Sequence, residues 1–403
     1  MTIGIDASRA NLLHKTGTEW YSFYLIKNLA EIDHTNKYWL YVNKPPRQEL
    51  IEAVSHNSNF SFKLLNWPIY SFWTLGRLTL EMIWCRPDVL FVPAHALPLF
   101  GPFKTVNTIH DLAFWHERNL YRSVKSKTKL FGSHKLINFL VTVITLGRYR
   151  SNSVDYLYWS TSFALRHAKK IIAVSDFTKQ EILEVYKKTL PTKIEVVHNG
   201  YNSDLYPPLN LAEKLPKVLT KYSLDFPYFL YVGRLEKKKN TVALVEAFAL
   251  LLENHPEIKS NLVLVGDASF GYDEVKYSIQ EYNLESRVIL PGWIKEEDLP
   301  YIFSGAQAFI FPSKYVGFGI PILQSLACGV PTAVSDLPVL REVAGEAALY
   351  FDQNDKNSIS QAMFRIINDE QLRQELIIKG RERVKDFSFK KCAVETLKIL
   401  ENL

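Results

Sequence analysis

The stretch from Phe311 to Pro331 constrains what this chain can fold into more than any other part of it. The apolar run at 308–311 is short and ends at Pro312, which is typical of a buried strand in a parallel sheet. Gly317 and Gly319 follow within a few residues. Glycine accepts positive φ and lets the backbone approach a ligand closely, so we expect this loop to lie against whatever binds above the strand end.

A helix is predicted directly after this loop. Pro321 suits the first turn, residues 322–327 continue the helix, and Gly329 can cap its end. The first N–H groups of a helix have no partner inside it and carry the positive end of the helix dipole. The stretch therefore predicts a strand, a glycine loop and a helix that together form a site for an anion or a polar ligand.

The same alternation of strand and helix recurs along the chain. We predict strands at 3–5, 38–42, 61–65, 89–92, 105–109, 170–174 and 194–197 in the first half, and at 228–232, 262–265, 288–290, 308–311, 332–334 and 349–351 in the second. Helical patterns lie between them. This order predicts an α/β fold with mainly parallel sheets that are covered on both faces.

The length of 403 residues fits two domains better than one. Residues 201–227 contain prolines and show no strong period, so we place the domain boundary there. We predict an N-terminal domain at 1–205, a second doubly wound domain at 206–385, and a helical segment at 386–403 that folds back on the first domain. Ligands in such sheets bind beyond the carboxyl ends of the strands.

Composition narrows the class of protein. The hydrophobic fraction of 47% and the charged fraction of 22% are ordinary for a soluble globular chain. Cys85, Cys328 and Cys392 lie far apart without a spacing typical of zinc or a disulfide frame, so we expect a reducing compartment. The N-terminus does not read as a signal peptide, and no apolar run reaches the roughly 18 residues of a spanning helix. A cytoplasmic location is expected.

Two basic side chains follow the first predicted strand of the second half. Arg234 directly succeeds Gly233, and Lys239 ends the run Lys237-Lys238-Lys239. Arginine offers a rigid fork of donors and lysine a mobile charge, so both are suited to holding a diphosphate. The alternative is a solvated charged loop. Arg234 favours the diphosphate, because a charge directly after an apolar strand is costly unless it is used.

A series of short motifs runs through nearly the whole chain. The first half contains Ile109-His110-Asp111, Val174-Ser175 and Asn199-Gly200. The second half contains Gly233-Arg234-Leu235-x-x-x-Lys239-Asn240, Gly266-Asp267, Pro291-Gly292-Trp293, Pro312-Ser313, Gly317-Phe318-Gly319-Ile320-Pro321, Ala327-Cys328-Gly329-Val330-Pro331, Ser335-Asp336 and Glu342-Val343. In order and spacing the series resembles the family 4 glycosyltransferases of the GT-B fold. The resemblance implies two Rossmann-like doubly wound domains facing a central cleft. It also implies sugar transfer from a nucleotide diphosphate sugar with retention at the anomeric carbon, without a metal or another cofactor.

The resemblance gives Arg234 and Lys239 a catalytic role. Both would stabilise the charge that develops on the leaving diphosphate. Gly17 and Thr18, at the start of the first predicted helix, are expected to add backbone donors to the donor site.

His110 and Asp111 follow a predicted strand of the first half. By the resemblance His110 is a catalytic residue that contacts the donor sugar, and the alternative is a histidine that caps a strand end. Asp111 is interpreted either as a loop cap or as a residue that orients the acceptor. No general base stands out, which agrees with a leaving phosphate that accepts the acceptor's proton.

The remaining donor contacts are predicted in the second half. Gly266 and Trp293 are expected near the base, although a tryptophan packed in the core would explain Trp293 equally well. We expect the donor sugar against Gly317, Phe318, Gly319 and Ile320.

Two positions depart from the family pattern. The family has a glutamate before the first glycine of the central loop and another eight residues later, where this chain has Val316 and Gln324. Gln324 can still hydrogen-bond the ribose hydroxyls, whereas Val316 cannot hydrogen-bond a sugar. The backbone near Phe318 and Gly319 then recognises the sugar, or a different sugar binds, or donor chemistry is impaired.

The segment 118–160 stands outside the shared pattern. It contains the basic residues Arg118, Arg122, Lys125, Lys127, Lys129, Lys135, Arg148 and Arg150 around the apolar run 136–146. This composition suits a peripheral contact with an anionic membrane, and a buried helix with a solvated basic flank is the alternative. A nucleic-acid partner is not expected, because the basic residues are local and no recognition module accompanies them.

The sequence therefore predicts a retaining hexosyltransferase that acts on a glycan or lipid-linked acceptor at the inner face of the membrane, in surface polysaccharide or glycolipid biosynthesis. On resemblance the donor is GDP-mannose, with a UDP-hexose as the near alternative. The alternative outside the enzymes is a non-catalytic partner subunit that binds nucleotide sugar. An epimerase would require carboxylates that we do not find.

Overall fold

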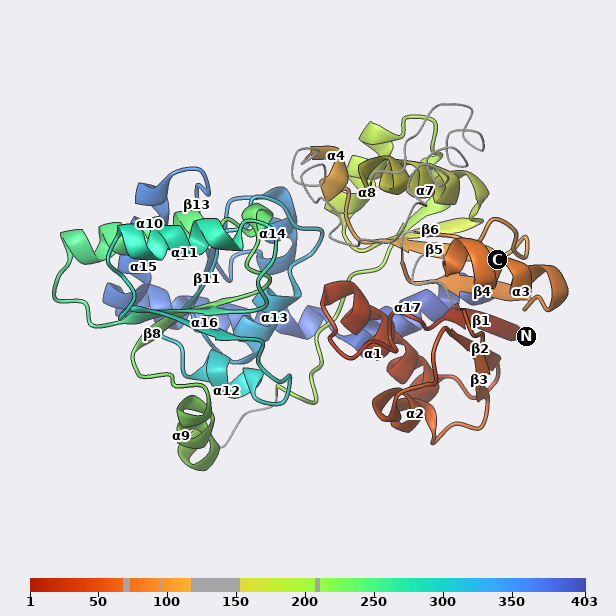
Figure 1. The fold of residues 1–403 in the computed structure, drawn as a ribbon, viewed down its shortest axis with the longest axis horizontal. Helices are drawn as coiled ribbons and strands as arrows, with labels where there is room; N and C mark the ends of the chain where they lie inside the picture. Colours follow the sequence, from red (N-terminus) through yellow and green to blue (C-terminus); the bar gives the residue numbers. More distant parts are fainter. Residues whose placement is uncertain (68–72, 95, 117–152, 207–210) are drawn as a thin grey trace, which may run out of the picture. The chain divides into compact units, whose positions relative to one another are not determined.

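The computed structural model describes residues 1–67, 73–94, 96–116, 153–206 and 211–403. Contacts divide the chain into two units, one formed by Met1–Gly200 with Phe389–Leu403 and the other by Tyr201–Ser388. Each unit is a parallel sheet with helices on both faces (Figure 1). The predicted α/β class is thus confirmed.

The sheet of the first unit has the order β3-β2-β1-β4-β5-β6-β7, and every pairing in it is parallel. Its strands are β1 (Thr2–Asp6), β2 (Lys37–Val42), β3 (Phe60–Leu64), β4 (Val89–Val92), β5 (Thr105–Ile109), β6 (Lys170–Ala173) and β7 (Ile194–Val196). The strand order reverses between β1 and β4. Ligands of open parallel sheets bind beyond the carboxyl ends of strands at such a point.

The helices of the first unit pack on this sheet and on one another. They are α1 (Gly17–Ile32), α2 (Gln48–Val54), a π-helical turn (Thr74–Leu78) that runs into α3 (Thr79–Trp84), α4 (Ala113–His116), α7 (Ser153–His167), α8 (Asp176–Val185) and α17 (Phe389–Glu401). The C-terminal α17 packs against α1, where the rings of Tyr24 and Phe389 stack 4.9 Å apart. Asn36 also donates a hydrogen bond of 3.0 Å to Glu401.

The second unit repeats the pattern in a sheet of order β10-β9-β8-β11-β12-β13, with a reversal between β8 and β11. Its strands are β8 (Tyr228–Val232), β9 (Asn261–Val265), β10 (Val288–Gly292), β11 (Ala308–Phe311), β12 (Thr332–Ser335) and β13 (Leu349–Phe351). Its helices are α9 (Leu211–Lys221), α10 (Thr241–Asn254), α11 (Tyr272–Glu281), α12 (Leu299–Ser304), α13 (Ile320–Ala327), α14 (Pro338–Ala344), α15 (Lys356–Asn368) and α16 (Glu370–Arg383).

The central strands of the second unit are buried on both faces. Phe229, Phe309 and Phe311 are at most 1% exposed, and the rings of Phe309 and Phe311 stack 5.8 Å apart. Such strands read as continuous apolar runs because helices cover both sides. Truncating a buried phenylalanine to alanine typically costs about 3–5 kcal/mol, so these side chains fix the strand ends that carry the site.

The boundary segment 201–227, in which the sequence shows no strong period, contains a helix. α9 lies within it and packs against α12. Pro216 sits inside this helix, which hid it because proline disfavours helix interiors. Lys221, the last residue of α9, forms an ion pair of 2.6 Å with Asp298. In the described part of the chain, no helix combines the length and the apolar character needed to cross a membrane.

Candidate functional site

The predicted donor residues of the second unit follow four strands at one edge of its sheet. Arg234 comes after β8, Gly266 after β9, Trp293 after β10 and the loop 312–319 after β11. These strands are neighbours and parallel, so their carboxyl ends share an edge. The structure therefore brings these residues to the place where such sheets bind ligands.

The loops after β8 and β9 are joined by backbone hydrogen bonds. Gly233 donates to Val265 over 2.9 Å, and Leu235 donates to Asp267 over 3.0 Å. Gly266 lies at this seam with φ of 144°, and a Cβ there would stand 2.0 Å from the backbone oxygen of Gly233. Only glycine fits such a position. Gly266 thus has a packing role that the sequence interpretation, which saw only a donor contact, did not contain.

The three lysines in the turn after β8 make different contacts. Lys237 lies 3.3 Å from Glu274, and Lys238 lies 3.5 Å from Glu236. The ammonium of Lys239 lies 5.6 Å from the ring centroid of Phe311, the last residue of β11. This contact places Lys239 at the carboxyl end of β11.

Arg234 is exposed at the same edge. Its backbone oxygen accepts a hydrogen bond of 3.0 Å from Tyr231, which fixes the start of the loop while the guanidinium extends to solvent. The backbone of Lys314 donates to Lys238 over 3.0 Å, so the turn with Lys239 is attached to the loop after β11. Arg234 and Lys239 therefore lie on loops after β8, β9 and β11 that backbone hydrogen bonds join to one another.

The glycine loop before α13 has one left-handed residue where two were expected. Gly319 has φ of 103° and is the N-cap of α13, whereas Gly317 does not have positive φ. The side chain of Phe318 is 3% exposed, with its ring 5.8 Å from that of Phe387. What this loop can offer a ligand is its backbone, with Ile320 as the first residue of the helix.

Gln324 and Trp293 occupy accessible positions. Gln324 lies half-buried on α13, and Val316 is half-buried in the loop before it. Trp293 is 40% exposed and follows Gly292, whose φ is 76°. A core position for Trp293 is thereby excluded. The hydroxyl of Ser313, after β11, is buried without a hydrogen-bond partner among the described residues.

In the first unit, the loop after β1 is held rigidly up to the start of α1. The buried ammonium of Lys15 lies 2.5 Å from Glu49, and 5.0 Å and 5.1 Å from the ring centroids of Trp20 and Phe23. Gly17 begins α1, with Thr18 beside it, and no atom lies within 4 Å of a Cβ placed on Gly17. The helix start is therefore open, and nothing in the fold itself requires a glycine there.

Glu19 completes the start of α1. Its carboxylate accepts a hydrogen bond of 3.1 Å from the backbone of Thr16, and it lies 3.2 Å from the guanidinium of Arg9. Burial alone would raise the pKa of Glu19, but the hydrogen bonds from Thr16 and the charge of Arg9 lower it overall. Glu19 is thus an ionised cap for α1.

His110 follows β5 and is 8% exposed. Its Nε2 lies 3.0 Å from the backbone oxygen of Pro93, and its ring meets Tyr21 edge to face at 4.8 Å. A carbonyl only accepts, so Nε2 carries the hydrogen and Nδ1 is the acceptor side of the ring. Burial lowers the pKa of His110, which keeps the ring neutral near pH 7. A neutral imidazole can bond a sugar hydroxyl.

Asp111 caps α4, because its carboxylate accepts a hydrogen bond of 3.0 Å from the backbone of Ala113. The loop-cap interpretation therefore has a structural basis, and a role toward the acceptor stays a prediction. Arg9 was missed by the sequence interpretation. Its side chain is 54% exposed after β1, and its charge acts on the pKa of both His110 and Tyr156. A cation soon after the first strand was the only signal of it in the sequence.

Most of the predicted membrane segment, 117–152, lies outside the described residues. The described remainder belongs to α7, where Tyr158 packs 5.1 Å from Phe114 and 5.2 Å from Trp115. Tyr158, near the end of the segment, thus packs within the first unit.

Comparison with known proteins covers both units. A family model for Glycosyltransferase Family 4 matches residues 15–205, and one for Glycosyl transferases group 1 matches residues 214–383. The O-antigen chain mannosyltransferase B of Escherichia coli is 33% identical over 326 residues, which cover 80% of this chain and 82% of that protein. A UDP-Gal:alpha-D-GlcNAc-diphosphoundecaprenol alpha-1,3-galactosyltransferase of the same organism is 28% identical over 300 residues, covering 70% and 75%.

A solved structure, Anabaena HepE in complex with UDP-glucose, matches with a TM-score of 0.71 at 16% identity, covering 100% of this chain and 99% of that one. Together with the two parallel-sheet units, this likeness defines a protein of the GT-B fold. The chain belongs to the group 1 glycosyltransferases, and it is a glycosyltransferase.

Proposed function

We propose that this glycosyltransferase moves mannose from GDP-mannose to a glycan or lipid-linked acceptor, with retention at the anomeric carbon. The observation that carries the proposal is the pair Arg234 and Lys239 at the carboxyl edge of the second sheet, beside the reversal between β8 and β11. Two cations on hydrogen-bonded loops at a strand end are suited to binding a diphosphate.

In the proposed reaction the bond between the anomeric carbon and the β-phosphate oxygen breaks, and the leaving nucleoside diphosphate takes the bonding pair. Arg234 and Lys239 stabilise the negative charge that appears on it. The acceptor hydroxyl attacks from the same face and gives its proton to the leaving phosphate. His110, which is neutral, is proposed to bond a donor hydroxyl through Nδ1.

We also propose that the reaction needs no metal. The two cations can supply the positive charge that a bound Mg²⁺ supplies in other reactions of phosphates. Gly17 and Thr18 add N–H groups at the open start of α1. Chelation with EDTA should then leave turnover unchanged, and restoration of a lost activity by Mg²⁺ would contradict metal independence.

The donor is proposed from the relatives and from the chemistry of the loop before α13. The relative with 33% identity is a mannosyltransferase, which favours mannose. Gln324 can bond ribose hydroxyls, while the backbone at Phe318 and Gly319 provides the sugar recognition that Val316 cannot. A UDP-hexose is the second candidate, because a 28% identical relative is named for UDP-Gal and the Anabaena structure holds UDP-glucose.

The acceptor is proposed to be a growing surface polysaccharide or a lipid-linked intermediate at the inner face of the membrane. The names of the two Escherichia coli relatives support this, since one refers to the O-antigen chain and the other to a diphosphoundecaprenol lipid. A peripheral membrane contact through 118–160 stays a prediction. A non-catalytic partner subunit is the competing proposal, and the presence of Arg234, Lys239 and His110 together weighs against it.

The test is a panel of nucleotide sugars, each incubated with the purified protein with and without membrane extract, followed by mass spectrometry of the released nucleotide. GDP release from GDP-mannose that depends on the extract would support the proposal. Release of UDP from UDP-hexoses alone would show that the donor is a UDP-hexose and not GDP-mannose. Nucleotide-sugar binding without release across the panel would favour the non-catalytic partner subunit.

A further inference from the structure

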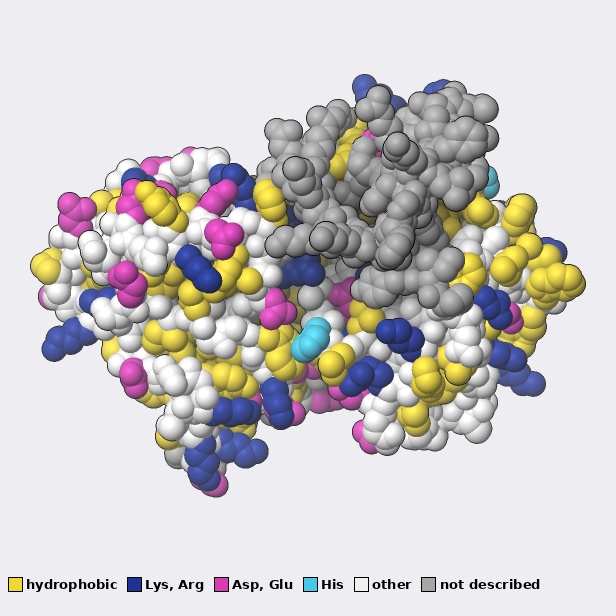
Figure 2. Space-filling model, viewed as in Figure 1, with side chains coloured by type: hydrophobic (Ala, Val, Ile, Leu, Met, Phe, Trp, Pro, Cys, Tyr) yellow, Lys and Arg dark blue, Asp and Glu magenta, His cyan; other side chains and the backbone are white. Residues whose placement is uncertain are grey.

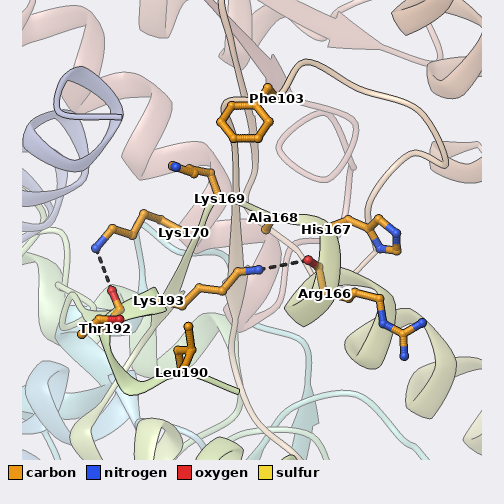
Figure 3. A pocket seen from close by; sticks show the side chains of 9 residues that line it. All are labelled: Phe103, Arg166, His167, Ala168, Lys169, Lys170, Leu190, Thr192 and Lys193. Atoms are coloured by element: carbon orange, nitrogen blue, oxygen red, sulfur yellow. Dashed lines mark hydrogen bonds between the residues drawn. The ribbon is translucent and has the colours of Figure 1, made fainter. Parts of the chain in front are cut away.

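The edge of the first sheet at which its strands β5, β6 and β7 begin carries a basic pocket. Strands β5, β6 and β7 are neighbours and parallel, so the segments that lead into them lie at one edge. His110 follows β5 at the other edge. The pocket has a volume of about 410 Å³. It is lined by Phe103, Arg166, His167, Ala168, Lys169, Lys170, Leu190, Thr192 and Lys193, as Figure 3 shows.

Backbone contacts hold two of its lysines in place. Lys193 donates to the backbone oxygen of Arg166 over 3.1 Å, and Lys170 donates to that of Thr192 over 2.9 Å (Figure 3). Lys170 also pairs with Glu195 at 2.5 Å. Lys169 is exposed, and its ammonium lies 4.8 Å from the ring centroid of Phe103.

The charges at this edge are strongly unbalanced. The ranges 99–105, 166–170 and 187–195 contain the cations Lys104, Arg166, Lys169, Lys170, Lys187, Lys188 and Lys193, against the single carboxylate of Glu195. Burial and, after it, the charge of Lys169 lower the pKa of Lys193. An anion bound in the pocket would relieve this crowding of like charges.

Apolar side chains project from the same edge. Phe103 is 79% exposed and Leu190 is 68% exposed, and both line the pocket. In the loop before β5, Phe100 is 62% exposed, and Trp84 at the end of α3, just before β4, is 84% exposed. The backbone of Leu99 donates to the hydroxyl of Thr79 over 2.9 Å, which ties this loop to α3. Figure 2 shows hydrophobic side chains gathered over α3.

We propose that this edge binds a membrane surface rich in anionic lipids. Lipid phosphates occupy the basic pocket, and Trp84, Phe100, Phe103 and Leu190 enter the interfacial layer, where aromatic and aliphatic side chains beside lysines bind well. A soluble anion alone would leave the exposed apolar residues unexplained, and an apolar partner would leave the lysines unexplained. None of the residues named for this surface belongs to the segment 118–160, and the inference does not depend on the sugar donor.

Vesicle flotation tests the proposal with the full-length protein at physiological salt. Wild type should float with phosphatidylglycerol vesicles and stay in solution with phosphatidylcholine vesicles. The double variant Arg166→Glu/Lys169→Glu should bind at least about 25-fold more weakly, since each basic residue near an anionic surface contributes about fivefold. The double variant Trp84→Ser/Phe103→Ser should also lose binding, and its exposed positions make loss of folding a small concern.

The matched control is Lys259→Glu/Lys356→Glu, which makes the same charge change at exposed lysines of the second unit. It should bind within about twofold of wild type, with circular dichroism and melting used to compare the folding of all variants. An equal loss of vesicle binding in this control would show that binding depends only on the net charge of the protein, and it would overturn the proposal. Binding that survives in both test variants but is lost in Lys125→Glu/Lys127→Glu/Lys129→Glu would place the contact in 118–160 instead. Competition by glycerol phosphate that abolishes flotation without any effect of the Trp84 and Phe103 substitutions would indicate a soluble ligand.

Discussion

The backbone oxygen of Gly233 lies 2.0 Å from where a Cβ on Gly266 would stand. The two glycines end adjacent strands, and hydrogen bonds from Gly233 to Val265 and from Leu235 to Asp267 draw their loops together. Arg234 lies directly on this seam. The position of the predicted catalytic cation thus depends on the absence of a side chain on a neighbouring strand.

Gly266→Ala should therefore destabilise the second unit by several kcal/mol, because both the clash and the φ of 144° oppose a side chain. Thermal unfolding followed by circular dichroism would show a large fall in melting temperature. An unchanged melting temperature would contradict close packing of Gly266 against the backbone of Gly233.

Gly17→Ala should leave stability unchanged and lower turnover. No atom lies within 4 Å of the added Cβ, so the melting temperature should stay within about 2 °C of wild type or rise, since alanine favours a helix. Nucleotide-sugar turnover should fall at least tenfold if the diphosphate approaches the start of α1. Unchanged turnover would remove Gly17 from the donor site.

Arg234→Ala and Lys239→Ala should each lower turnover by about 100- to 1,000-fold, the usual loss when a group that stabilises transition-state charge is removed. Lys237→Ala is the matched control, because Lys237 is exposed and pairs with Glu274. It should keep turnover within about threefold of wild type. Similar losses in all three variants would indicate a general effect of positive charge on the turn.

Stability should depend on pH through His110. Its folded pKa lies below the ordinary value of about 6.5, so on acidification the unfolded chain takes up this proton before the folded one. Its contribution to stability is complete above about pH 6.5 and is lost as the pH falls toward the folded pKa. His110→Gln keeps a donor for Pro93 but does not titrate. Melting curves from about pH 7.5 to 5.5 should fall less steeply for the variant, and equal slopes would contradict a neutral, buried His110.

The strands were predictable because they are fully buried. Runs such as Phe229–Tyr231 and Phe309–Phe311 are apolar throughout, and that pattern indicates a parallel sheet with helices on both faces. The start of α8 follows a local rule as well, because serine favours helix N-caps and the hydroxyl of Ser175 accepts a hydrogen bond of 3.0 Å from the backbone of Thr178. By contrast α9 was hidden by Pro216, because propensity argues against the helix that packing on α12 stabilises.

The candidate site was predictable only as a set of loops. Motifs placed Arg234 and Lys239 at a strand end, but the pairing of Lys237 with Glu274 and the contact of Lys239 with Phe311 join residues distant in the sequence. Arg9 escaped because its partner Glu19 is met only when α1 folds against the loop after β1. The close packing of Gly266 against Gly233 was also not predictable, because the two residues meet only when β8 and β9 pair in the sheet.

The most direct test of the account is the anomeric configuration of the transferred sugar. The protein would be incubated with GDP-α-mannose labelled with ¹³C and with membrane extract, and the one-bond coupling at the anomeric carbon of the product would be measured by NMR. The account predicts α-linked mannose in the glycan or lipid fraction, with one GDP released for each mannose transferred. A β-linked product would contradict retention, and nucleotide binding without transfer from any donor would contradict catalysis itself.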